Sequence, residues 1–353
     1  MALATLACFA LLLNPIQQVP QTNLDKLALY TRIRQSTVKV YSEFGDKRYH
    51  GTGVGYKRCG DFVMVITNSH VVAEDGGISP NVEVQPFSRT EKTRLPAYVL
   101  FEFKDDDYFF DLAFLIVRDP EFKITAAQRG LNTNWKKEPV YACGNPRQEE
   151  FLVDHGSVLP KTLAPKEAQK HSWVVVHDAL IEHGNSGGGL FDSAGKLVGI
   201  NTWLVDEKYG MAIDLDLFND LFDFRYTAVS AWEDWQQDAS LAKGSSVFML
   251  AVGKWKPRSD WDECTPGGFS DGGENSLLSE FNFGCLLAKL GDKTASFNKA
   301  HWGPNRTSVI YPDARIAEIK SGGGPLSFRI NRQDFSAASG RLNVFYLIMK
   351  PQI

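Results

Sequence analysis

The sequence predicts an all-β protein with two domains. Short apolar runs recur at close intervals through its first two thirds and are separated by turn residues, at 37–41, 62–67, 97–103, 112–117, 140–142, 173–176 and 197–201. Closely spaced strands of this kind are typical of β-barrels and β-sandwiches, whereas parallel α/β folds alternate strands with long helices. At 353 residues the chain is also too long for one small core, which favours two domains.

Two short helices are expected among these strands. Asn23 is placed to cap the first, in which apolar side chains recur at helical spacing, at Leu24, Leu27 and Tyr30. A second amphipathic helix, which would close the first domain, is predicted from Leu215, Phe218, Leu221 and Phe222. The stretch 226–244 places two tryptophans among polar residues, and we interpret it as a linker to a second domain over 245–353.

Composition excludes some classes of partner. The net charge is −4 and basic residues do not cluster, which argues against a nucleic-acid partner. No internal apolar run is long enough to span a bilayer. Residues 1–22 form a candidate signal segment: the apolar run 1–13 has the length of a signal-peptide core, although it lacks a basic start and a clear cleavage motif. We therefore favour export, to the periplasm or outside the cell, over a packing role for this segment.

The five cysteines leave an odd count. If Cys8 is removed with a signal segment, four remain, and their pairing cannot be deduced from sequence. Cys264 and Cys285 would suit a bridge within the second domain, and two buried free thiols are an alternative of similar weight.

The most informative segment is 183–190, His-Gly-Asn-Ser-Gly-Gly-Gly-Leu. It can present the Ser186 hydroxyl beside free backbone N–H groups. Acyl transfer needs a nucleophile and donors aimed at the developing oxyanion, and the N–H groups of Gly184 and Ser186 are candidates for that pair. Gly184 can adopt the positive φ that such a turn requires.

A base and its orienting acid are found upstream. One apolar strand ends on His70, and another begins at Asp111. With Ser186 these residues supply a nucleophile, a general base and a carboxylate that holds the imidazole. The Gly184-x-Ser186-x-Gly188 pattern also fits the nucleophile elbow of α/β-hydrolases, but that fold places its acid and histidine after the serine. Only His301 follows Ser186, in the second domain.

Four segments carry a family resemblance: 51–55 (Gly-Thr-Gly-Val-Gly), 67–72 (Thr-Asn-Ser-His-Val-Val), 111–113 (Asp-Leu-Ala), and 178–179 (Asp-Ala) leading into 184–188 (Gly-Asn-Ser-Gly-Gly). Through them residues 23–225 resemble the trypsin-like serine proteases of the HtrA type. The resemblance implies a chymotrypsin-like pair of six-stranded β-barrels with the active site between them. His70 would be the base, Asp111 its orienting acid and Ser186 the nucleophile.

The same resemblance implies a substrate pocket. It places Leu180 at the base and Leu204 and Gly210 along the walls, and none of these residues is charged. Such a pocket offers no partner to a buried Lys or Arg, so we expect cleavage after small or medium aliphatic residues. Trp203 and the strand from Thr202 are expected to bind the substrate backbone as an added β-strand.

The second domain shows no sign of the peptide-binding PDZ domain that usually follows in HtrA-type proteases. It resembles the soluble galactose-binding lectins of bacteria instead, through segments 251–255, 284–291 and 324–331, which implies a jelly-roll-like β-sandwich. Arg332, Ala337 and Ala338 stand where those lectins have oxygen ligands for calcium. Since calcium needs six to eight oxygens, we expect no calcium site. No histidine spacing indicates another metal or a cofactor.

The leading hypothesis is a serine endopeptidase that cleaves proteins or peptides through an acyl-enzyme, with a C-terminal targeting or binding domain. The alternative is a binding protein, for a carbohydrate or a protein, that keeps the protease fold as an idle scaffold. The presence of His70, Asp111 and Ser186 together favours the enzyme, because a scaffold has no physical need of all three.

Overall fold

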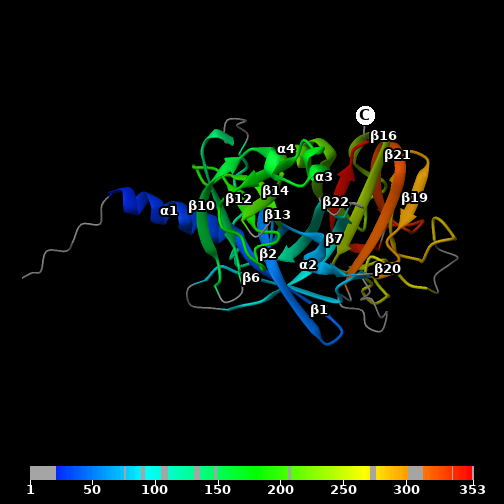
Figure 1. The fold of residues 1–353 in the computed structure, drawn as a ribbon. Coiled ribbons are helices and arrows are strands. Elements are labelled where there is room, and N and C mark those ends of the chain that lie inside the picture. The colour runs from blue at the N-terminus through cyan, green and yellow to red at the C-terminus, as the bar shows by residue number, and fades with distance from the viewer. Residues whose placement is uncertain are drawn as a thin grey trace, which may run out of the picture.

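The computed structural model describes residues 21–74, 77–88, 92–104, 110–130, 136–146, 149–205, 208–270, 276–300, 313–335 and 337–351. They form two closed β-barrels and a further sheet that lies beside the first barrel (Figure 1). In that view the second barrel is green and the C-terminal sheet, yellow to red, lies on the right. The all-β class and the chymotrypsin-like double barrel are thus confirmed.

The first barrel closes in the strand order β1-β2-β3-β8-β7-β6. Its core is built by β-branched and aliphatic side chains that alternate inward along the strands, such as Val38 and Val40 of β1. The strands are β1 (Thr37–Phe44), β2 (Lys47–Cys59), β3 (Phe62–Thr67), β6 (Asn81–Pro86), β7 (Leu95–Lys104) and β8 (Asp111–Arg118). A short pair, β4 (Ala73–Glu74) and β5 (Gly77–Ile78), follows helix α2 (Ser69–Val72).

The second barrel closes in the order β10-β11-β14-β13-β12-β9 around its own apolar core. Its strands are β9 (Pro139–Gly144), β10 (Leu152–Leu159), β11 (Val174–His177), β12 (Gly189–Phe191), β13 (Leu197–Val205) and β14 (Tyr209–Asp214). The seven apolar runs predicted from the sequence coincide with strands, except that Trp173 lies just before β11. The short helices η2 (Lys161–Leu163) and α3 (Lys166–Gln169) connect β10 to β11.

Both predicted helices are present, as α1 (Gln21–Ser36) and α4 (Leu215–Leu221). However, α1 begins before the predicted cap Asn23, and Phe222, which the sequence predicts in the second helix, is the first residue of β15. The first half of α1 extends away from the barrels (Figure 1). Leu24 and Leu27 are accordingly 44% and 51% exposed, and it is Leu29 and Ile33, further along, that pack into the core. The packing face predicted from Leu24 and Leu27 is therefore wrong.

The C-terminal sheet has the strand order β15-β22-β16-β21-β18-β19, with β17 paired to β22 and β20 to β21. Its strands are β15 (Phe222–Ser230), β16 (Gln236–Val252), β17 (Trp255–Lys256), β18 (Leu286–Leu290), β19 (Lys293–Ser296), β20 (Lys299–Ala300), β21 (Ala314–Ile330) and β22 (Ser339–Met349). The sequence resemblance predicts two facing sheets, as in a jelly-roll-like sandwich. In the structure, the described strands instead form one connected sheet.

The predicted linker over 226–244 is wrong. These residues lie largely in β15 and β16, which both pair with β22. The signal that the sequence offered is the alternation of Phe222, Phe224 and Tyr226, whose rings pack into the core while the residues between them face outward. The C-terminal sheet therefore begins at Phe222, directly after α4, and not at residue 245.

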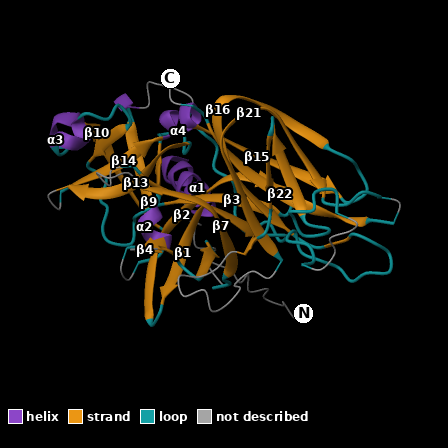
Figure 2. Ribbon diagram, turned by 90° about the vertical axis from the view of Figure 1, so that its right-hand side faces the viewer, coloured by secondary structure: helices purple, strands orange, loops and turns teal. Residues whose placement is uncertain are grey.

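Aromatic contacts join the C-terminal sheet to the first barrel. The ring of Phe62 lies 4.9 Å from that of Phe345, and Phe101 lies 4.0 Å from Phe248, between ring centroids. One continuous hydrophobic core contains residues of both barrels and of this sheet. Figure 2 shows β15 and β22 beside β3 and β7. The C-terminal sheet is therefore packed against the first barrel through β15, β16 and β22.

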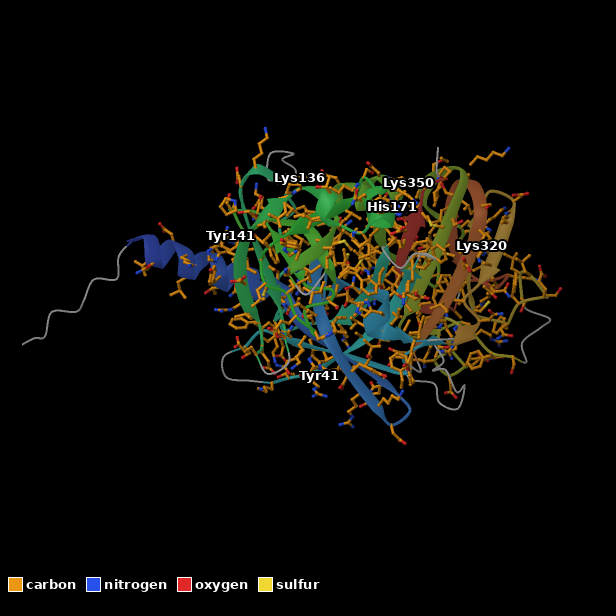
Figure 3. All side chains as sticks on the ribbon, viewed as in Figure 1. Tyr41, Lys136, Tyr141, His171, Lys320 and Lys350 are labelled. Atoms are coloured by element: carbon orange, nitrogen blue, oxygen red, sulfur yellow. The ribbon has the colours of Figure 1, made fainter. Side chains whose placement is uncertain are left out.

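A cavity of about 540 Å³ remains at this junction. Phe103, Phe110 and Trp173 form aromatic walls, and His171 and Lys350 also line it (Figure 3).

The four cysteines in the described residues, Cys59, Cys143, Cys264 and Cys285, are buried free thiols. Burial raises the pKa of Cys264 and of Cys285 to about 12, so both remain protonated. Within the described ranges no helix is long and apolar enough to cross a membrane. Cys8, His301 and nearly all of the candidate signal segment 1–22 lie outside those ranges.

Candidate active site

The loop that carries Ser186 connects β11 to β12 and is held by a series of backbone hydrogen bonds. The N–H of Asn185 donates to Glu182 O at 2.9 Å, that of Gly187 to Asn201 O at 2.8 Å, and that of Gly188 to Asn185 O at 2.9 Å. Among the described residues, the N–H groups of Gly184 and Ser186 have no acceptor. The loop thus leaves free the two donors that the sequence predicts.

Two glycines allow this loop geometry. Gly184 has φ +104° and Gly187 has φ +82°, a region that side chains with a Cβ rarely adopt. Space is equally limiting, because a Cβ on Gly187 would lie 2.2 Å from the Thr52 carbonyl oxygen. A residue with a side chain at either position would therefore displace Ser186.

Asp111 and His70 form a close pair on the first barrel. His70 lies in α2, directly after β3, and Asp111 is the first residue of β8, which pairs with β3. The Asp111 side chain is fully buried, and its Oδ1 accepts the backbone N–H of His70 at 3.0 Å. Its Oδ2 is hydrogen-bonded to His70 Nδ1. Because Nδ1 is occupied in this way, Nε2 is the ring nitrogen left for a proton transfer.

His70 and Ser186 line the same cavity of about 600 Å³ between the barrels. The ring of Trp203 lies 5.9 Å from that of His70 and covers one side of it. No hydrogen bond joins Ser186 to His70 among the described contacts. Catalytic hydrogen bonds are often long before substrate binds, so the arrangement remains compatible with proton transfer between the two.

Thr202, Trp203 and Leu204 all line this cavity, as the sequence predicts for substrate-binding residues. Thr202 also connects β13 to the His70–Asp111 pair. Its Oγ1 accepts from Asn68 Nδ2 at 3.1 Å, and the same amide donates to the Asp111 carbonyl at 2.6 Å. This edge of β13 is therefore fixed relative to the buried carboxylate.

The placement of Leu180 at the pocket base is wrong. Its side chain is 53% exposed, while its neighbours Ala179 and Ile181 are buried. The backbone N–H of Leu180 donates to Asp154 Oδ2 at 2.7 Å. Ile181 takes the inward position and lines the cavity.

Gly210 lies behind the cavity wall. A Cβ there would lie 2.3 Å from His177 Cε1 and 2.9 Å from Ile181 Cδ1, so this glycine lets β14 approach two side chains under the pocket. His177 is fully buried, and its Nε2 is 3.1 Å from Asn201 Oδ1. Burial lowers the pKa of His177 to about 4, and the imidazole is neutral at pH 7.

Sequence reasoning missed three residues of the site. Ile181 could have been found from the alternation around Leu180. Asn201 carries no signal of its own, although it lines the cavity and accepts the Gly187 N–H through its backbone oxygen. Thr52 lies in the Gly-Thr-Gly segment that carried the family resemblance, and it contacts the Ser186 loop directly. Within the described residues, no group of three or more His, Cys, Asp or Glu side chains is arranged to hold a metal ion.

Residues 51–200 match the trypsin-like peptidase domain. The segment begins in β2 and ends in β13, so it contains His70, Asp111 and Ser186.

Several curated proteins are similar to part of this chain. Mouse serine protease HTRA4 is 32% identical over 157 residues, which are 43% of this chain and 30% of the mouse protein. The serine protease Do-like HtrA of Lactobacillus helveticus is 30% identical over 174 residues, 48% of this chain and 37% of that protein. The matched region thus spans about a third of these relatives.

Two solved structures are also similar. A serine endoprotease from Yersinia pestis is 25% identical and has a TM-score of 0.44, covering 58% of this chain and 66% of that one. The structure of Deg5 is 20% identical and has a TM-score of 0.46, and the match covers 58% of this chain and 95% of the Deg5 chain.

Proposed function

We propose that the protein is a serine endopeptidase. Ser186 Oγ attacks the carbonyl carbon of a peptide bond while His70 Nε2 accepts its proton, and the N–H groups of Gly184 and Ser186 stabilise the oxyanion. The protonated imidazole then gives its proton to the departing amine, which leaves an acyl-enzyme. Water, deprotonated by His70, releases the acyl group. Asp111 holds the imidazole in the required tautomer throughout.

One observation carries this proposal. The Ser186 hydroxyl and an imidazole oriented by a fully buried carboxylate line one cavity, and the loop that lines it also carries two backbone N–H groups, of Gly184 and Ser186, without acceptors among the described residues. A buried carboxylate is costly to keep unless it has partners, and both oxygens of Asp111 are bonded to His70. The match to a peptidase domain and the names of the relatives, which are serine proteases, support the same reading.

The apolar wall residues favour small or medium aliphatic substrate residues before the cleaved bond. Ile181 replaces Leu180 in this argument, and Leu204 lines the same cavity. Neither offers a partner for a buried Lys or Arg, whose desolvation would cost several kcal/mol. We further propose that the edge of β13 at Thr202 and Trp203 binds the substrate backbone as an added strand.

Hydrolysis of a fluorogenic peptide library by the full chain and by Ser186→Ala tests the proposal. The wild-type chain is expected to cleave after Val, Ala or Leu, and the variant to lose activity by several orders of magnitude while keeping its circular dichroism spectrum. Undiminished turnover by the folded variant would contradict the proposal. A dominant preference for Lys or Arg would contradict the pocket assignment alone.

For the C-terminal sheet we propose a targeting or binding role that requires no calcium. The Asn331 amide donates to the carbonyls of Leu278, Phe281 and Asn282, so it organises a loop. Arg332 is buried beside it. A glycan array run with and without EDTA tests this role, and glycan binding that EDTA removes would overturn the calcium-free assignment. Glycan binding by a chain without peptidase activity would support the alternative, an idle protease scaffold.

We also propose that the protein is secreted or periplasmic. This proposal rests on the candidate signal segment 1–22 alone.

A further inference from the structure

Thr52 connects the first barrel to the Ser186 loop by hydrogen bonds. It lies in β2, is fully buried, and has no role in the mechanism above. Its backbone N–H donates to the Ser186 carbonyl at 2.8 Å, and its Oγ1 lies 2.7 Å from the Gly184 carbonyl oxygen. Thr52 thus contacts the carbonyl oxygens of Gly184 and Ser186, the two residues whose N–H groups have no acceptor among the described residues.

The direction of the hydroxyl hydrogen bond is fixed by a neighbour on the second barrel. The backbone N–H and the Nδ2 of Asn145 both donate to Thr52 Oγ1, each at 3.0 Å. The Asn145 Oδ1 accepts from the Phe151 N–H at 3.0 Å, which supports this orientation of the amide. A hydroxyl has one proton and two acceptor sites. With both acceptor sites occupied, its proton is directed to the Gly184 carbonyl.

These contacts restrict the peptide planes around the nucleophile. The 184–185 peptide is held by Thr52 Oγ1 at its oxygen and by Glu182 O at its N–H. The 186–187 peptide is held by the Thr52 N–H at its oxygen and by Asn201 O at its N–H. Between them, the Asn185 carbonyl accepts from Gly188, which turns the Ser186 N–H to the opposite side. Gly184 has no Cβ to oppose a rotation, so an external contact is needed to keep its geometry.

We propose that the Thr52 hydroxyl is a positioning residue for the oxyanion hole. It acts through the Gly184 carbonyl and does not touch substrate. This inference rests on the proposed peptidase function, because it assigns Thr52 a part in presenting the Gly184 and Ser186 donors. Preorganised donors lower a barrier only when they are held in place before the reaction.

Phosphonylation by a fluorophosphonate tests the proposal without any need for the natural substrate. In that reaction Ser186 Oγ forms a bond to phosphorus, fluoride leaves, and His70 receives the serine proton, while the phosphoryl oxygen occupies the oxyanion hole. Four full-length chains are compared: wild type, Thr52→Val, Thr52→Ser and Thr37→Val. Thr37 is the matched control, since it is equally buried in the same barrel and donates to the Ile33 carbonyl at 2.9 Å.

Thr52→Val is expected to lower the maximal labelling rate about 10- to 100-fold, less than the loss of a donor itself, with little change in the inhibitor concentration for half-maximal rate. Thr52→Ser should restore most of the rate, and Thr37→Val should label like wild type. A Thr52→Val chain that is folded and labels at the wild-type rate would overturn the proposal. So would an equal loss in Thr37→Val, or a Thr52→Ser chain as slow as Thr52→Val. Failure of the wild-type chain to label would instead refute the peptidase function on which the inference rests.

Discussion

The cleft between the barrels and the junction with the C-terminal sheet are both buried, yet different forces hold them. In the cleft, the contacts are hydrogen bonds between polar groups such as Asp111, Asn145 and Thr52. At the junction, they are ring contacts such as that of Phe62 with Phe345. Net hydrogen bonds contribute about 1 kcal/mol each, whereas a fully buried aromatic side chain is worth several.

The contacts of the cleft therefore determine the geometry of the site, whereas those of the junction determine the stability of the fold. Polar contacts are directional, so those of the cleft fix where the reacting groups lie. Apolar contacts are strong and non-directional, so those of the junction join the C-terminal sheet to the first barrel. Changes in the cleft should therefore reduce activity with modest effects on folding, and changes at the junction should do the reverse.

The largest effect is expected for Asp111→Asn. An amide in place of the carboxylate can donate to His70 Nδ1 and thereby favour the wrong tautomer, and such a change costs about 10⁴-fold in kcat. Steady-state hydrolysis at pH 7 and a urea titration measure the two consequences. A folded variant that keeps more than a tenth of the activity would show that the buried carboxylate does not orient the base.

Phe345→Ala should have the reverse profile. Phe345 is fully buried against Phe62 and Tyr226, and its truncation is expected to cost about 3–5 kcal/mol of unfolding free energy. Phe122→Ala, at a ring that is 61% exposed, should cost less than about 1 kcal/mol. Both are measured by denaturant unfolding. Two separate transitions for sheet and barrels in the wild-type chain would contradict their cooperative junction.

Acid should destabilise the second barrel through His177. Its pKa in the fold is about 4, below the unfolded value of 6.5, so the unfolded chain binds the proton first as the pH falls. The contribution of neutral His177 is therefore complete above pH 6.5 and is lost progressively toward pH 4, by at most about 3 kcal/mol. In His177→Gln the unfolding free energy should fall less over this interval. Parallel pH profiles for the two chains would show that His177 is not the cause.

Leu204→Gly should produce the smallest effect, a change of specificity. Removing this side chain from the cavity wall widens the pocket, so cleavage after Phe relative to Val should rise about 10-fold, within the range of a hydrophobic pocket change. The ratio of kcat/KM for two matched peptides measures it. Leu180→Gly, at the exposed neighbouring position, is the control and should leave the ratio unchanged. An unaltered ratio in Leu204→Gly would remove Leu204 from the pocket.

The sequence predicts the barrels better than it predicts the pocket. Apolar strands such as Phe62–Thr67 carry their own signal because both their composition and their period reflect burial. The linker prediction is wrong because the polar residues around Trp232 interrupt the apolar pattern that indicates a strand. In addition, the partner of β15 is β22, which lies more than a hundred residues later in the chain. Leu180 and Ile181 differ by one position, and only the hydrogen bond to Asp154 and the burial of its neighbours decide which side chain faces inward. The role of Thr52 depends on contacts between the two barrels, which no local pattern reports.

The central claim is that the cleft activates Ser186, and mass spectrometry after fluorophosphonate treatment tests it most directly. The account predicts one phosphonyl group per wild-type chain, located on Ser186 by peptide mapping, and none on Ser186→Ala. An unlabelled wild-type chain, or a label on another serine, would contradict the account.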